Sequence, residues 1–249
     1  SYGGLCGSNN VVSGSSAARD ITYFHANSVM RMYNFSRGTN CGSTMSTGNT
    51  RPEAIMEYTD GFTIPIRTPF WLEGMGMDME GDNLTYCFEQ HDAASKSCQL
   101  GDPSDECPAF RSYPPNQANH RVFPRFSTIW NNQTFSDRNE VPVSYSRELN
   151  FVLTVRDNNS EAGAFGMDTV TFFTDENAGP FSVTYPNNAE TQVAGDIVEI
   201  RWDVANTDKA PVNCKNVDIL LYGSSSWGNY TVLLEGTEND GSEWVKMPE

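Results

Sequence analysis

Alternating apolar and polar positions predict a pair of strands between Pro69 and Gln90. This period of two is typical of a half-buried strand. The apolar positions that share a face are Phe70 and Leu72 in the first strand, then Leu84, Tyr86 and Phe88 in the second. Residues 78–83 between them are Asp, Glu, Gly and Asn apart from one Met, which favours a turn. A single hairpin cannot bury such a face alone, so we expect a second sheet and a β-sandwich.

The same alternation returns along the rest of the chain. The strands that it predicts lie in residues 149–157, 168–174, 181–185, 198–204, 217–221, 230–234 and 244–247. Pro65 and Pro69 indicate an edge position for the strand that precedes them. The last five strands fall short of the roughly seven of an immunoglobulin-like sandwich, so we expect an unpaired sheet edge there.

A helical period appears near the beginning of the chain. Apolar residues recur at helical spacing between Ile21 and Phe35, Asp20 is the expected N-cap, and Gly38 is the expected stop. Residues 1–19 lack any period and are expected to form a loop. The sequence therefore predicts a mainly β chain of three parts. These are a loop and helix in 1–42, a sandwich with a long Pro- and Cys-rich insertion in 43–178, and a second, incomplete sandwich in 179–249.

Composition narrows the function classes. The 249 residues are 38% hydrophobic and 12% aromatic, which is enough for a core. The net charge of −16 argues against nucleic acid and anionic membrane surfaces as partners and favours cations or basic proteins. No apolar run approaches the roughly 20 residues of a membrane span. The chain opens with Ser1 and has no signal peptide, so we expect a processed product or a fragment.

The six cysteines indicate an oxidising, extracellular compartment, because no CxxC pair appears and histidine is scarce. We expect a Cys98–Cys107 bridge around an acidic loop and a Cys6–Cys41 bridge from the opening loop to the end of the helix, although spacing alone does not fix the connectivity. Cys87 and Cys214 are then either paired or free. The N-glycosylation sequons of such a secreted chain are at Asn34, Asn83, Asn132, Asn158 and Asn229.

Several segments resemble one family of proteins. They begin with Tyr2-Gly-Gly-Leu-Cys-Gly, Tyr23-Phe-His-Ala and Cys41-Gly, and they continue through the 68–90 hairpin, 147–158, 179–184, 202–205 and 210–219. Together they are similar to secreted reprolysin-like metallopeptidases, a metzincin family. The resemblance implies the very end of the catalytic domain followed by immunoglobulin-like sandwiches of the cadherin, polycystic-kidney-disease or fibronectin III type.

The zinc motif of that family, His-Glu-x-x-His, is absent. His25, His91 and His120 have no partner four residues away, so they cannot form the helical zinc grip of such enzymes. Zinc is therefore expected only in a longer precursor, and this chain is expected to have no catalytic residues. His25 is expected to pack or to cap the helix.

Three further sets of residues are candidate sites. Asp78, Glu80 and Asp82, with Asp157, supply the oxygen ligands that calcium prefers, although a solvated acidic turn is the plainer interpretation. Glu89 and Asp92 form a conceivable acid/base pair with no sign of a cleft. Trp71, Trp130 and Trp227 are candidates for stacking on sugars. The alternative is that they pack under a loop or at an interface.

Three functions follow, and they remain alternatives at this point. The first is a non-catalytic, extracellular β-sandwich region of a reprolysin-like metallopeptidase-type protein that binds or positions other protein parts. The second is a structural subunit of an extracellular filament, appendage or coat, joined to copies of itself through β-edge contacts. The third is an adhesion module that binds calcium or glycans.

Overall fold

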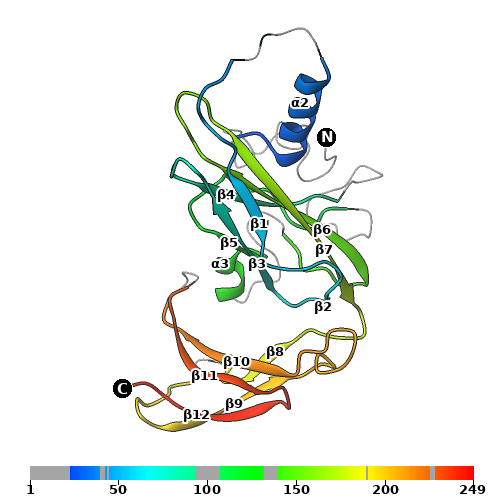
Figure 1. Ribbon diagram of the computed structural model, residues 1–249. Helices are drawn as coiled ribbons and strands as arrows, with labels where there is room; N and C mark the ends of the chain where they lie inside the picture. Colours follow the sequence, from blue (N-terminus) through cyan, green and yellow to red (C-terminus); the bar gives the residue numbers. More distant parts are fainter. Residues whose placement is uncertain are drawn as a thin grey trace.

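The computed structural model describes residues 23–39, 43, 45–92, 107–131, 140–188, 190–224 and 228–249. The chain is mainly β, as expected, and has several sheets, none of them closed. The described helices are α2 (Ala26–Gly38) and α3 (Phe126–Trp130). Neither combines the length and apolarity that crossing a bilayer requires. Figure 1 shows α2 at one end, a first group of strands in the middle and a second group at the other end.

The first group of strands forms two facing sheets. One has the order β1-β3-β5 and the other β2-β7-β6-β4. Their strands are β1 (Glu53–Met56), β2 (Thr63–Pro65), β3 (Phe70–Met77), β4 (Thr85–Gln90), β5 (His120–Phe123), β6 (Arg147–Arg156) and β7 (Phe165–Asp175). All these pairs are antiparallel except β2 with β7, which is parallel. Pro65 therefore lies in an edge strand, as predicted.

Aromatic side chains fill the space between these sheets. Phe151 is fully buried and lies 4.8 Å from Phe123 and 5.5 Å from Phe172, measured between ring centroids. Phe70 and Phe110 pack against the same ring. The predicted inward residues of β4 and β6, from Leu84 to Val155, belong to this cluster. The hydrophobic alternation therefore identified the core correctly.

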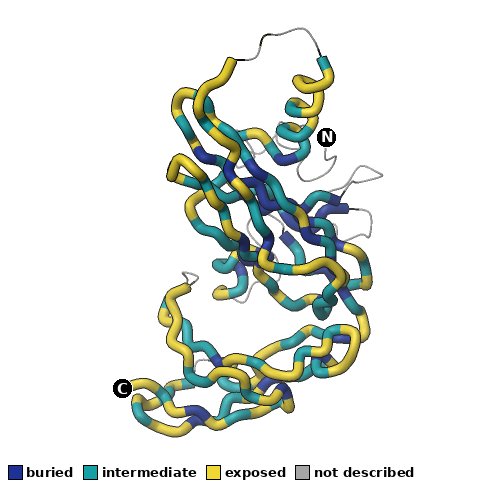
Figure 2. Tube along the Cα trace, in the orientation of Figure 1, coloured by how far each residue is buried: buried dark blue, intermediate teal, exposed yellow. Residues whose placement is uncertain are grey.

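The second group is smaller and less buried. Its sheets have the orders β12-β9-β8 and β10-β11. The strands are β8 (Ser182–Tyr185), β9 (Ile197–Asp203), β10 (Asn216–Tyr222), β11 (Tyr230–Glu238) and β12 (Ser242–Lys246). Its buried hydrophobic cluster consists of Trp202, Ile219 and Val245. Figure 2 shows that dark, buried residues concentrate in the first group, whereas the second is largely intermediate or exposed.

Hydrogen bonds tie the two groups together at their junction. The Gly179 N–H donates to Ala205 O at 2.8 Å, and the Phe181 N–H donates to Thr68 Oγ1 at 3.0 Å. Gly179 has φ 101°, and a Cβ there would lie 2.3 Å from Ile66 O. Only glycine fits this close approach.

Two local expectations were wrong. The helix begins at Ala26, with His25 as its N-cap, rather than after Asp20. Residues 23–25 are not helical, because the first helical N–H finds its acceptor in a distant carboxylate described below. In β11, the alternating apolar residues Tyr230 and Val232 of the predicted strand 230–234 are 43% and 42% exposed, and the pairing of β10 with β11 shifts register near Ile219.

Candidate functional site

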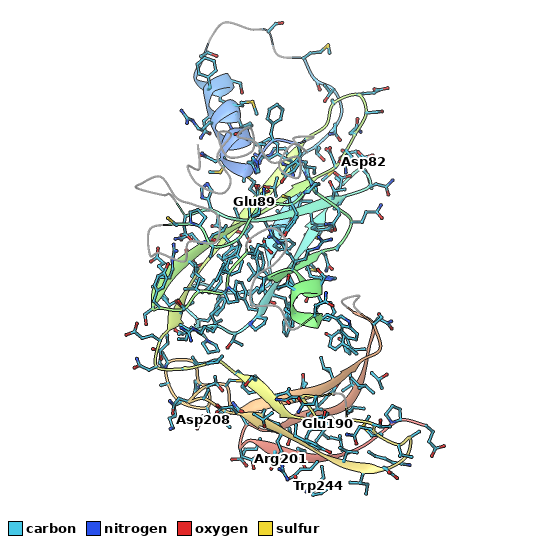
Figure 3. The ribbon with its side chains drawn as sticks, turned by 180° about the vertical axis from the view of Figure 1, so that it is seen from behind. Asp82, Glu89, Glu190, Arg201, Asp208 and Trp244 are labelled. Carbon is cyan, nitrogen blue, oxygen red and sulfur yellow. The ribbon has the colours of Figure 1, made fainter. Side chains whose placement is uncertain are left out.

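A buried carboxylate joins the first group of strands to the start of α2. Glu89 on β4 has no exposed surface. One of its oxygens lies 2.7 Å from His25 Nδ1, and the other accepts the Ala26 backbone N–H at 2.7 Å. A negative charge is favourable where a helix begins, because the first backbone N–H groups have no partner within the helix. Glu89, His25 and Ala26 are called the Glu89 clasp below, and Figure 3 shows Glu89 beneath α2.

The carboxylate of the Glu89 clasp is held in its charged form. Burial by itself raises the pKa of Glu89, but hydrogen bonds from His25, from Ser112 and from the Ala26 N–H outweigh it and lower the pKa below 4.5, the ordinary value. Such a pKa means that the folded chain stabilises the ionised group. The clasp is thus a charge-dependent attachment of the helix to the sheet.

Further contacts surround the clasp. The Tyr23 hydroxyl lies 2.7 Å from Ser112 Oγ, and Arg156 Nη2 donates to Phe24 O at 2.8 Å. A cleft of about 570 Å³ lies alongside, lined by Val29 and Met32 of α2 and by residues of the strands and loops beneath it. The attachment therefore involves β4, β6 and the segment around Ser112, and not the clasp alone.

Three aspartates converge at the same end of the first group. Asp78 and Asp82 come from the turn between β3 and β4, and Asp157 comes from the turn after β6. One carboxylate oxygen from each lies within 4.8 Å of the others. Figure 3 places Asp82 at the end of the molecule that carries α2. Two turns distant in sequence thus bring their acidic side chains together.

The predicted calcium set is assembled in part. Glu80 does not join the three aspartates, since its carboxylate accepts the Thr50 hydroxyl at 2.6 Å. Asn49 contacts the group, because its Nδ2 donates to Asp157 Oδ2 at 2.7 Å. Sequence reasoning missed Asn49, because nothing in the linker indicates that it folds back onto this turn.

The three aspartates offer the type of oxygen ligand that calcium prefers. Asp78 Oδ1 and Asn49 Oδ1 are buried atoms without a hydrogen-bond partner. Burial raises the pKa of Asp157, but hydrogen bonds from Asn49, Ala164 and Asn159 outweigh it and hold this pKa below its ordinary value. Several carboxylate and amide oxygens around one point are what calcium prefers. No other group of three potential metal ligands occurs among the residues that the structure describes.

The proposed acid/base pair is not assembled. Glu89 is engaged in the clasp, while Asp92 accepts Asn150 Nδ2 at 2.8 Å and pairs with Arg147 at 3.3 Å. Each carboxylate already has hydrogen-bonding partners within the fold, so both have a structural role. His25 lies at the helix N-cap position within the clasp, which agrees with its expected packing or capping role.

The candidate aromatic residues are on different elements. Trp71 on β3 is 48% exposed, as its outward position predicted, and Trp130 at the end of α3 is 44% exposed. Trp227 lies outside the described residues. The sugar-stacking role of these residues stays a prediction.

The cysteines and sequons are described in part. Cys87 is buried and free, and Cys214 is also free, which settles the alternative left open by the sequence. Burial raises the pKa of the Cys87 thiol. Cys107 is buried and disulfide-bonded, but Cys6, Cys41 and Cys98 lie outside the described residues, so both expected bridges remain predictions.

The sequon asparagines differ in their surroundings. Asn34, Asn83, Asn158 and Asn229 are exposed, and Asn132 lies outside the described residues. Asn158 Nδ2 donates to Asn83 O at 2.7 Å, and Asn229 Nδ2 donates to Ser224 Oγ at 2.9 Å. Glycosylation of either nitrogen would replace these contacts.

Comparison with known proteins does not assign the chain to a protein family. No protein-family model matches it, and no curated protein matches it either. The resemblance to reprolysin-like metallopeptidases therefore stays a prediction from the quoted segments.

Proposed function

We propose that this chain is a non-catalytic, extracellular protein-binding region that holds a neighbouring segment in a fixed position, within a reprolysin-like metallopeptidase-type protein. The observation that carries the proposal is the Glu89 clasp. A fully buried carboxylate that accepts the first N–H of α2 is a costly arrangement, because a buried charge is tolerated only when it is well partnered. The held segment follows Tyr23-Phe24-His25, which resembles part of the end of the catalytic domain of that family.

The strand orders support the immunoglobulin-like part of the proposal. In the first group β1-β3-β5 corresponds to strands A, B and E of such a sandwich, and β2-β7-β6-β4 corresponds to A′, G, F and C. In the second group β8-β9-β12 corresponds to A, B and E, while β10 and β11 form the opposite layer. Sandwiches of this kind commonly serve as rigid supports for binding surfaces.

Replacing Glu89 with alanine is expected to release α2. The helix has 13 residues, a length that is marginal for an isolated helix, and Ala26 is its buried residue. Loss of a buried charged hydrogen-bonding group should cost about 3 kcal/mol. Hydrogen exchange followed by mass spectrometry should show that amides 27–38 lose at least tenfold in protection, about 1.4 kcal/mol.

The matched control for this test is Glu161→Ala, which removes an exposed carboxylate and should leave the exchange of α2 unchanged. Lowering the pH should also weaken the attachment of α2. Because the folded pKa of Glu89 is depressed, its contribution is present above pH 4.5 and is lost as the pH falls through the folded pKa. Unchanged protection of α2 in Glu89→Ala would remove the positioning role. Peptides of the natural protein that include His-Glu-x-x-His ahead of Ser1 would support the family part separately.

A second candidate function, calcium binding, is favoured by the three converging aspartates. Extracellular calcium modules bind with Kd of roughly 10⁻⁴ to 10⁻³ M. At roughly ten times Kd, calcium should stabilise the fold by about 1.4 kcal/mol. Thermal melting should therefore shift upward with CaCl2 and much less with MgCl2.

The decisive variant for calcium is Asp82→Asn, which removes one charged ligand from the group. It should abolish most of the calcium-induced shift in Tm. Asp208→Asn, a partly exposed aspartate in the second group of strands, should retain the full shift. An equal response of the wild type to both cations, or to none, would leave the aspartates as a hydrogen-bonded turn.

A further inference from the structure

The second half of β3 carries its large apolar side chains on the wrong side for an ordinary half-buried strand. Gly74 and Gly76 face the opposite sheet, where a Cβ would lie 2.5 Å from Leu153 Cδ2 and 2.8 Å from Val155 Cγ1, respectively. The intervening Met75 and the following Met77 point outward and are 48% and 51% exposed. A strand normally places its apolar residues inward and its polar residues outward. Here the inward positions have no side chain and the outward positions are methionines.

Strand pairing places residues of β1 and β5 beside these outward side chains of β3. Met75 lies opposite Ile55 of β1, and Trp71 lies opposite Val122 of β5. The outer face of this sheet is called the methionine face. Its exposed or half-buried apolar members are Ile55, Trp71, Met75 and Met77, with Glu73 between Trp71 and Met75, whereas Val122 is only 8% exposed. Exposed apolar side chains gathered on one face mark an interaction site more often than scattered apolar residues do.

Acidic residues border the methionine face. Glu53 lies opposite Met77, and the Glu57 N–H donates to Glu73 O, which places these two glutamates beside each other. The pKa of nearby Tyr58 is raised by burial and then by the charges of Glu73 and Glu57, which indicates a negative local potential. With a net charge of −16 on each chain, a second copy would be repelled.

The length of the face matches one helix. β1 pairs with the second half of β3 and β5 with the first half, so two strands about 4.8 Å apart lie side by side along the face. From Trp71 to Met77, the face is about 20 Å long, which equals roughly 13 helical residues. Methionine side chains are flexible and adapt to different apolar partners, so they suit a helix that presents leucine-like residues.

We propose that the methionine face is the docking surface for a cationic amphipathic helix of another protein, with its apolar side on Met75 and Met77 and its basic residues toward the glutamates. Glu89 belongs to the other sheet. Asp157 lies in the turn after β6, and Asp78 and Asp82 lie in the β3–β4 turn beyond Met77. The inference therefore does not rest on the clasp, and variants of the face test it separately.

The test uses the whole chain and a fluorescently labelled 14-residue peptide of Leu and Lys, patterned as an amphipathic helix. Fluorescence anisotropy at near-physiological salt should show saturable binding. Met75→Ser combined with Met77→Ser should weaken binding at least tenfold, and Glu53→Gln combined with Glu57→Gln should weaken it severalfold. Met45→Ser, which changes a methionine that is 84% exposed outside the face, should leave the affinity unchanged. Because Met75 and Met77 are about half exposed, their variants should keep the wild-type circular dichroism and Tm.

Peptide controls separate the alternatives. A scrambled peptide of the same composition should bind at least tenfold more weakly, and a Leu/Glu peptide of the same pattern should not bind. Equal binding of the scrambled peptide would overturn the proposal in favour of unspecific charge attraction. Equal binding to the Met75/Met77 double variant would overturn the location. A concentration-dependent dimer in sedimentation, lost in that double variant, would assign the face to a second copy instead.

Discussion

Phe151→Ala is expected to lower the free energy of unfolding of the first group of strands by about 3–5 kcal/mol. Phe151 is fully buried and lies at the centre of a ring cluster with Phe123 and Phe172. Removing the ring loses its transfer free energy and leaves a cavity that packed neighbours fill only in part. Urea unfolding followed by circular dichroism should show a lower midpoint at an unchanged slope.

Phe173→Ala is the matched control for that substitution. Phe173 lies on β7, one residue beyond buried Phe172, and is 40% exposed. The same truncation should cost well under half as much there. Similar losses for both variants would mean that the rings between the sheets do not dominate stability.

Glu140→Ala is expected to have an effect of similar size, about 3–5 kcal/mol, because it breaks a buried ion pair and leaves a charge behind. Glu140 has no exposed surface and accepts Arg121 Nη2 at 2.6 Å and the Arg125 N–H at 3.0 Å. Arg121 itself is nearly enclosed, with its guanidinium 4.2 Å from the Phe123 ring centroid. The same urea titration measures the loss.

Two variants sharpen the ion-pair prediction. Glu140→Gln keeps the shape and should cost less than alanine, because the amide oxygen still accepts hydrogen bonds. Glu176→Ala, at an exposed site, should change stability by no more than about 0.5 kcal/mol. A loss below about 1 kcal/mol for Glu140→Ala would contradict the role assigned to this pair.

Residue patterns predicted much of the fold because its strands are governed by burial. Leu149, Phe151 and Leu153 alternate inward on β6 as expected, and the hairpin partner of β6 is β7. The start of α2 was not predictable in this way. Its acceptor, Glu89, lies 63 residues from Ala26 in sequence, so no local signal marks it.

The candidate metal group shows a similar limit. Asp78 and Asp82 lie four residues apart in one turn, so their proximity follows from the turn. Glu80 lies between them in sequence, but its carboxylate accepts the Thr50 hydroxyl instead of joining them. Asp157 was correctly included, whereas Asn49 and the Arg121–Glu140 pair depend on long-range packing and had no sequence signal.

The parallel pairing of β2 with β7 has a mechanical consequence. Thr63, Ile64 and Pro65 run alongside Phe173, Thr174 and Asp175, near the beginning and the end of the first group of strands. A force that pulls these two ends apart slides the strands along each other, so the ladder is loaded in shear and its bonds share the tension. In a hairpin pulled from its open end, the bonds would instead unzip one after another. The first group of strands is thus built to resist stretching along the chain.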